Sequence, residues 1–236
     1  MNKNRNISVV IITKNEEHNL QRCLESCHFF HDIVVVDSGS TDRTADIAVA
    51  AGARVISQDW LGFGPQKQKA VELGQHDWFF SIDADECLTP DLAASILEAD
   101  LSDRNTAYTM NRRSFFLGKE IRHSGWNPDW VVRLANRQVS QFTSDPVHER
   151  ITGYSTILRL NGRLLHYSYP TSAHVVQKTE LYGTLGRSSR MRKKNRYLAA
   201  TWSFFRTFIL RAGCLDGVSG YQIALMNART TFIKYS

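Results

Sequence analysis

The 236-residue sequence has few cysteines and no long apolar run. Its four cysteines show no spacing typical of a paired zinc motif, and so few of them in a chain able to build its own core favour a reducing compartment. No stretch reaches the roughly 20 apolar residues of a transmembrane helix. The apolar run Ile7–Ile12 is too short for a signal peptide. The sequence therefore predicts a cytoplasmic protein, or one that rests on a membrane from the cytoplasmic side.

Two nucleotide-binding motifs are also absent. The first predicted strand, Ile7–Ile12, is followed by Thr13-Lys14-Asn15-Glu16 and not by G-x-G-x-x-G, which argues against a dinucleotide cofactor. The chain contains no G-x-x-x-x-G-K-[ST] sequence, which excludes a P-loop ATPase.

The positive charge is concentrated in one segment. The formal net charge is +6, and the segment 187–196 alone holds six Lys and Arg residues and no acid. The rest of the chain is therefore balanced. A composition of 42% hydrophobic and 22% charged residues is that of an ordered globular protein.

Apolar runs alternate with helical patterns in the first hundred residues. Strands are predicted at 7–12, 33–36, 54–57 and 78–82, and helices at 17–27, 44–51, 65–73 and from Pro90, with Thr89 as the cap. This alternation predicts an α/β fold with a doubly wound, mostly parallel sheet. Later strands are predicted at 107–110, 131–134 and 157–165, and the chain is helical, basic and aromatic from Thr171. We expect a domain over 1–165, with a nucleotide half to about residue 100 and an acceptor half after it, and a helical region over 166–236.

Three of the predicted strands end in polar clusters, at 13–16, 37–42 and 83–86. Ligands of an open parallel sheet bind beyond the carboxyl ends of its strands, so these clusters are expected along one crevice. Asp83 and Asp85 are placed to hold Mg²⁺ or Mn²⁺, which take one or two carboxylates together with substrate phosphates. The alternative for this pair is two solvated loop acids. Asp37 can bind a base or ribose, or can cap its own turn through Gly39.

These three clusters, taken in order, resemble the inverting family-2 glycosyltransferases of GT-A fold. The resemblance rests on Ile7–Glu17, Val34–Thr44 and Ser81–Glu86. Four further segments are similar to the bacterial lipopolysaccharide inner-core β-glucosyltransferases, which extends the resemblance over nearly the whole chain: Asp59–Gln68, Pro146–Glu149, Leu165–Tyr169 and Leu215–Gly220.

The resemblance implies a metal-dependent, inverting hexosyltransferase. The donor would be a UDP-sugar, with glucose expected, and the acceptor a heptose of the lipid A–core. The nucleotide sugar would be held by Thr13, Asn15, Glu16, Asp37, Gly39, Lys67 and Asp83, and the metal by Asp83 and Asp85. Lys67 stands where relatives often carry Arg. Lysine keeps the positive charge but lacks the planar guanidinium group that can make two parallel hydrogen bonds.

An inverting transfer needs a base that takes the proton of the attacking hydroxyl. Glu149 is the first candidate and Asp129 the second. The alternative for Glu149 is an ion pair with Arg150 or another Arg. His148 either orients Glu149 or is a packed histidine.

The C-terminal region permits two interpretations. Cations at 187–196 followed by the aromatic segment 202–211 suit an anionic membrane surface, here the cytoplasmic face of the inner membrane. The same pattern also fits a helix with one core face and one solvated face. Nothing resembles a nucleic-acid-binding fold. The rival functions are a sugar nucleotidyltransferase, disfavoured by the missing glycine-rich loop, and a non-catalytic protein that binds nucleotide sugar or membrane.

Overall fold

A computed structural model describes residues 6–145, 149–185 and 195–236. Its backbone divides into two compact units. The first unit contains residues 1–112 and 130–166, and the second contains 113–129 and 167–236. The predicted domain boundary at residue 166 stays a prediction. In the structure, the segment 113–129 also belongs to the second unit.

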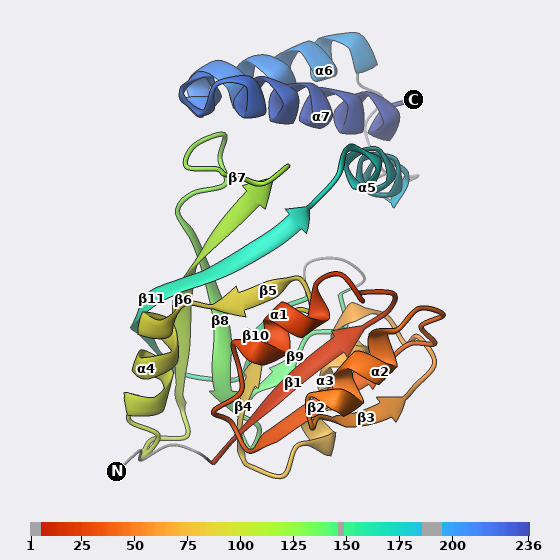
Figure 1. Ribbon diagram of the computed structural model, residues 1–236. Helices are drawn as coiled ribbons and strands as arrows, with labels where there is room; N and C mark the ends of the chain where they lie inside the picture. The colour runs from red at the N-terminus through yellow and green to blue at the C-terminus, as the bar shows by residue number, and fades with distance from the viewer. Residues whose placement is uncertain (1–5, 146–148, 186–194) are drawn as a thin grey trace. The chain divides into compact units, whose positions relative to one another are not determined.

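The first unit is a mixed sheet covered by helices, with the strand order β3-β2-β1-β4-β8-β6-β11-β5 (Figure 1). β1, β2, β3 and β4 are parallel, whereas β8 runs antiparallel to β4 and β5 antiparallel to β11. The strands are β1 Ile7–Thr13, β2 Asp32–Asp37, β3 Arg54–Ser57, β4 Trp78–Ser81, β5 Glu86–Leu88, β6 Thr106–Phe116, β8 Asp129–Asn136 and β11 Thr156–Tyr169. The strands β9 Gln141–Phe142 and β10 Ile151–Thr152 form a separate pair. The α/β fold class is confirmed.

Helices cover both faces of this sheet. They are α1 Leu20–Glu25, α2 Thr44–Ala50, α3 Phe63–Leu73 and α4 Pro90–Glu98. β1 is buried between β2 and β4, which explains why it is apolar from Ile7 to Ile12 at every position except Ser8. Its Val9 and Ile11 pack in the core with α1, α2 and α4, and its Val10 packs in the core with α3.

The predicted helices and strands are present with shifted ends. The first helix is shorter than expected, at Leu20–Glu25, and α3 begins two residues before Pro65. Thr89 caps α4 by accepting a hydrogen bond from the backbone N–H of Leu92, with Pro90 in the first turn.

The second unit is built around a helical hairpin. Its elements are β7 Lys119–Glu120, α5 Ser172–Leu185, α6 Arg196–Phe205, the π-helix η1 Arg206–Leu210, the 3-10 helix η2 Gly213–Asp216 and α7 Val218–Lys234. α6 and α7 run antiparallel: Tyr197 meets Phe232 near one end, and Phe204 meets Tyr221 near the other. Within the described residues, no helix is long and apolar enough to cross a membrane.

Asp216 joins η2 to the loop after β7. Its carboxylate is 4% exposed and accepts hydrogen bonds from the backbone N–H groups of Arg122 and His123 and from the hydroxyl of Ser124. A buried polar group is costly unless it is hydrogen-bonded, and these donors satisfy the carboxylate, so Asp216 serves the second unit as a structural residue.

Candidate functional site

The three predicted polar clusters meet at one edge of the sheet in the first unit. Thr13 pairs with Asp37 in register at the ends of β1 and β2, and the backbone N–H of Ile82 donates to Val10 where β4 ends. Adjacent residues of α3 contact two clusters: Gln66 donates to Ser38 Oγ at 3.0 Å, and Lys67 reaches Asp83. The three strand ends are therefore adjacent, as expected, whereas a crevice along them stays a prediction.

The first two clusters are joined by hydrogen bonds. The Asn15 side chain accepts from the backbone N–H of Thr41 at 2.8 Å, and the backbone N–H of Asn15 donates to Ser40 Oγ at 2.9 Å. The backbone N–H of Glu16 donates to Thr44 Oγ1 at 2.8 Å. These contacts fix Asn15 with a positive φ of 55°, a conformation that Asn adopts more readily than most residues. The loops are thus held as one rigid rim.

Asp37 caps its own turn. Its Oδ2 accepts from the backbone N–H groups of Gly39 at 3.1 Å and Ser40 at 2.9 Å. Gly39 has a φ of +77°, which favours glycine and lets the chain turn back at this point. The capping alternative is therefore present in the structure. A role of Asp37 and Gly39 in holding a nucleotide stays a prediction.

Asp83 lies between two cationic side chains. Lys67 Nζ is 2.7 Å from Asp83 Oδ1, and Arg133 Nη2 is 2.7 Å from Asp83 Oδ2. The cations are nearly buried, with 6% and 8% of their side chains exposed, and Asp83 is 25% exposed. Burial raises the pKa of Asp83, but attraction by Arg133 and Lys67 outweighs it and holds that pKa well below its usual range.

Both cations contact a second carboxylate. Lys67 Nζ lies 2.8 Å from Glu149 Oε1, and Arg133 Nη2 lies 2.8 Å from Glu86 Oε1. Arg112 also contacts Glu86, at 3.2 Å. Lys67 therefore lies between Asp83, a predicted metal ligand, and Glu149, the candidate base. The ion pair that was the alternative role of Glu149 forms with Lys67 instead of Arg150.

Asp85 faces a histidine from another strand. Its Oδ2 is 3.4 Å from Nε2 of His166 on β11, and both side chains are about one-sixth exposed. Carboxylate and imidazole are both ligands of divalent transition metals. Over the described ranges, no group of three or more His, Cys, Asp or Glu forms a preassembled metal cage.

The position of Lys67 depends on close packing of α3. A Cβ at Gly64 would lie 1.9 Å from the backbone oxygen of Thr143, so only glycine permits this approach. Gln68 then accepts from the backbone N–H of Phe142 at 3.0 Å. These two contacts bring α3 against the segment that leads to Glu149.

Some predicted residues lie elsewhere. Asp129 begins β8 and belongs to the second unit, so its role as a base stays a prediction. His148 and most of the basic segment, 187–194, fall outside the described residues. Conversely, the sequence assigned no role to Arg133, Arg112 or His166, because nothing local marks them as partners of the acidic cluster.

Comparisons with known proteins agree on one family. A family model described as glycosyl transferase family 2 matches residues 8–160. An uncharacterized glycosyltransferase of Rickettsia typhi is 30% identical, over 98% of this chain and 85% of its own length. The lipopolysaccharide core biosynthesis glycosyltransferase LpsC of Rhizobium meliloti is 31% identical, over 96% of this chain and 89% of its own.

A solved structure shows the same fold at lower identity. It is glucosyl-3-phosphoglycerate synthase from Mycobacterium tuberculosis in complex with Mn²⁺, uridine diphosphate and glucosyl-3-phosphoglycerate. Its sequence is 19% identical, the match covers 76% of this chain and 78% of that one, and the TM-score is 0.50. The likeness supports the GT-A fold.

Proposed function

We propose a specific transfer reaction for this chain, which belongs to glycosyl transferase family 2. The enzyme moves a hexose, with glucose as the expected sugar, from UDP to a heptose of the lipopolysaccharide inner core, with inversion at the anomeric carbon. The relative LpsC, named for lipopolysaccharide core biosynthesis, supports this acceptor class. An acceptor carried on lipid A would place the enzyme at the cytoplasmic face of the inner membrane.

The ion-pair network around Asp83 is the observation that carries this proposal. It joins three carboxylates and three permanent cations, which are formally balanced: Asp83, Glu86, Glu149, Lys67, Arg112 and Arg133. Lys67 and Arg133 are fixed beside the strand end where a donor diphosphate is expected. Fixed cations stabilise the charge that grows on the leaving UDP without having to reorganise.

The rim formed by the first two clusters suits the nucleotide. Thr13 is 5% exposed, and its hydroxyl has no hydrogen-bond partner within the described part of the chain. A buried unpaired hydroxyl is costly and is relieved when a ligand supplies a partner. We assign Thr13, Asn15 and Glu16 to uridine and Asp37 to the ribose.

The residues present fit a divalent metal. Mg²⁺ and Mn²⁺ take one or two carboxylates and complete their shell with phosphate oxygens and water, so the carboxylate of Asp85, which lies 3.4 Å from His166, is a fitting donor. Asp83 is paired with Lys67 and Arg133, and so the second aspartate is the better candidate for direct ligation. When bound, the metal supplies Lewis-acid neutralisation of the leaving diphosphate.

Glu149 is the proposed base. Its side chain is 16% exposed, so an acceptor hydroxyl can reach it, and its contact with Lys67 fixes one carboxylate oxygen. It takes the hydroxyl proton as the oxygen attacks the anomeric carbon and UDP leaves from the opposite side. Asp129 remains the second candidate.

A donor panel with Mg²⁺ or Mn²⁺ tests the proposal. UDP release is measured for each UDP-hexose, with and without core oligosaccharide, and the products are analysed. Only a transferase releases UDP with a lengthened oligosaccharide, whereas a nucleotidyltransferase does not. EDTA should abolish activity, and Asp85→Asn should lower turnover by about 10²-fold or more, the usual effect of losing a key electrostatic group.

Asp91→Asn is the matched control for this substitution, because Asp91 is an exposed acid on α4. It should retain wild-type turnover. Full activity in EDTA would remove the metal from the proposal, and the absence of UDP release with every donor would refute the transferase assignment.

A further inference from the structure

α6 exposes a row of large apolar side chains. Leu198, Trp202 and Phe205 recur at i, i+4 and i+7, which places them on one side of the helix. Their exposed fractions are 70%, 58% and 44%. We call these three residues the α6 row.

The opposite side of α6 is already packed. Phe204 lies against Tyr221 of α7, with ring centres 5.8 Å apart, and Ser203 Oγ accepts from Thr231 of α7 at 3.1 Å. The α6 row is therefore not the face by which the helix joins its own unit. A helix that is apolar on both sides is normally covered on both, so the row indicates an external partner.

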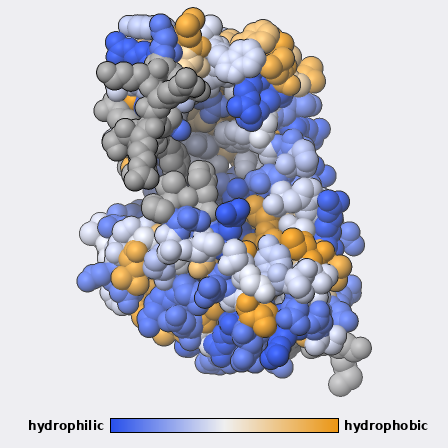
Figure 2. All heavy atoms as spheres, turned by 180° about the vertical axis from the view of Figure 1, so that it is seen from behind, coloured by the Kyte–Doolittle hydropathy of each residue, from blue (hydrophilic) through white to orange (hydrophobic). Residues whose placement is uncertain are grey.

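Exposed apolar side chains continue along the chain after α6. Ile209 of η1, Leu215 of η2 and Val218 at the start of α7 are 49%, 69% and 75% exposed. Figure 2 shows apolar side chains gathered on the C-terminal helices, at the top of the view. Single exposed apolar residues need no explanation, but successive ones over four elements do.

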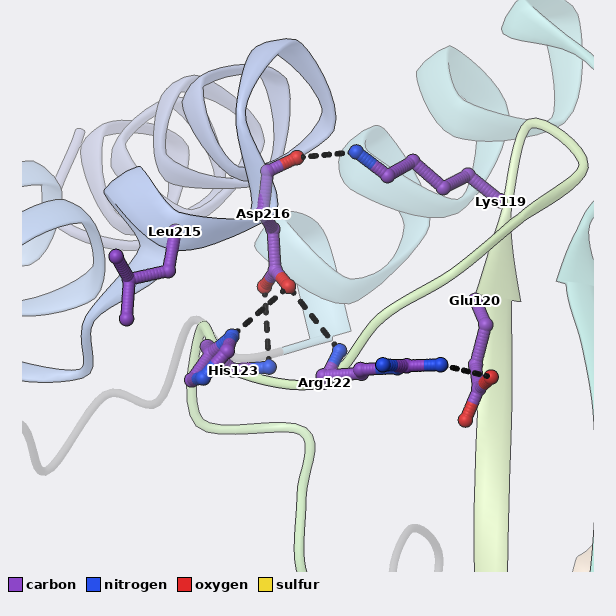
Figure 3. A pocket seen from close by; sticks show the side chains of 6 residues that line it. All are labelled: Lys119, Glu120, Arg122, His123, Leu215 and Asp216. Atoms are coloured by element: carbon purple, nitrogen blue, oxygen red, sulfur yellow. Dashed lines mark hydrogen bonds and ion pairs between the residues drawn. The ribbon is translucent and has the colours of Figure 1, made fainter.

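The C-terminal part of the chain is strongly basic. Residues 181–236 contain ten Lys and Arg residues and one acid, Asp216, which is buried. Arg206 and Arg211, both exposed, follow the α6 row directly. Figure 3 shows Leu215 beside an open pocket of about 430 Å³ that Lys119, Arg122 and one acid with a partly exposed side chain, Glu120, also line. Cations thus accompany the apolar side chains.

We propose that the α6 row, with Ile209, Leu215 and Val218, inserts into the headgroup region of an anionic lipid bilayer. Trp and Leu side chains together with Arg are the composition of surface-bound membrane helices. A second copy of the chain is a poorer occupant, because self-association through this strongly basic region would bring like charges together. The proposal extends the function above by naming its membrane contact, and it involves neither donor nor base.

Vesicle flotation tests this proposal with the full-length protein. Wild type is floated with phosphatidylcholine vesicles that contain or lack phosphatidylglycerol, and is compared with the triple variant Leu198→Gln, Trp202→Gln, Phe205→Gln. The matched control is Val49→Gln, Ile157→Gln, Leu158→Gln, whose residues lie in the first unit and are 63%, 50% and 47% exposed. Thermal unfolding checks that both variants fold.

Wild type should float with the anionic vesicles, and less so as salt rises from about 0.1 M to about 1 M, because salt screens the charge attraction. The α6-row variant should lose at least about 100-fold in partitioning, since each large apolar side chain withheld contributes roughly tenfold or more. The control should change less than about twofold. UDP release with a delipidated core oligosaccharide should be equal in all three proteins, which separates this proposal from the transferase assignment.

Equal flotation of the α6-row variant and the control would overturn the proposal. The proposal would also be overturned if wild type did not float with anionic vesicles and instead formed dimers that the α6-row variant cannot form. The second result would make another copy of the chain the partner of the row.

Discussion

Replacing Lys67 by Met tests the ion-pair network most directly. The change keeps the length and the apolar stem of the side chain but removes the cation that lies 2.7 Å from Asp83 and 2.8 Å from Glu149. Breaking a buried ion pair by removing one partner costs about 3–5 kcal/mol. Asp83 retains its ion pair with Arg133 and its side chain is one-quarter exposed, so we expect a loss at the lower end of this range, about 3 kcal/mol.

Thermal unfolding measures this loss. For a chain of this size, about 3 kcal/mol corresponds to a fall in the unfolding midpoint of roughly 6–12 °C. Lys67→Arg is the matched control, because it keeps the charge and can contact both carboxylates, and it should lose less than half as much. A midpoint for Lys67→Met within about 2 °C of wild type would show that the network does not hold the site together.

The pH dependence of stability gives a second readout of the same substitution. The pKa of Asp83 is depressed in the folded state, so its stabilisation is fully present above the unfolded value near 3.9 and is lost as pH falls through the folded value. Lys67 is one of the charges that depress this pKa. Its removal should therefore raise the pKa of Asp83 toward the unfolded value, so that the acid-side loss of stability is smaller than in wild type and is complete at a higher pH.

Further predictions concern the nucleotide rim and the base. Asp37→Ala should weaken UDP and UDP-sugar binding together, and an unchanged UDP affinity by calorimetry would leave Asp37 as a turn residue only. Glu149→Gln should spare UDP affinity and cut transfer by roughly 10²–10⁴-fold, the usual contribution of a general base. Asp129→Asn, measured in the same assay, should have the smaller effect. An inactive Asp129→Asn beside a near-wild-type Glu149→Gln would reverse the assignment.

The sheet edge could be predicted because its signals are local. The run Ile7–Ile12 is apolar at every position except Ser8, as expected for a strand buried on both faces. Each polar cluster directly follows such a strand, so the rule that ligands bind at strand ends was enough to bring 13–16, 37–42 and 83–86 together. The Asp37 turn is equally local, since its partners are two and three residues away.

The cationic half of the site could not be predicted in this way. Arg133 contacts Asp83 from 50 positions away, and Lys67 contacts Glu149 across 82 positions. No periodicity or spacing encodes such pairs, because they depend on which strand lies beside β4 and on how closely α3 approaches Phe142 and Thr143. Gly64 is a local sign of this close approach, but the need for glycine there becomes clear only from the position of the Thr143 backbone.

The contacts of Asp83 with Lys67 and Arg133 suggest how the site would change when a donor binds. Asp83 on its own would be an open ligand for any divalent cation, but here both of its oxygens are held by Lys67 and Arg133. A donor diphosphate attracts these same cations, and each one that turns toward phosphate loosens its hold on a carboxylate. Glu149 shares Lys67 with Asp83, so under the proposed function the arrival of donor would also change the surroundings of the proposed base. Donor binding and proton transfer would then be coupled through one side chain, and the removal of Lys67 should disturb stability, UDP affinity and transfer together.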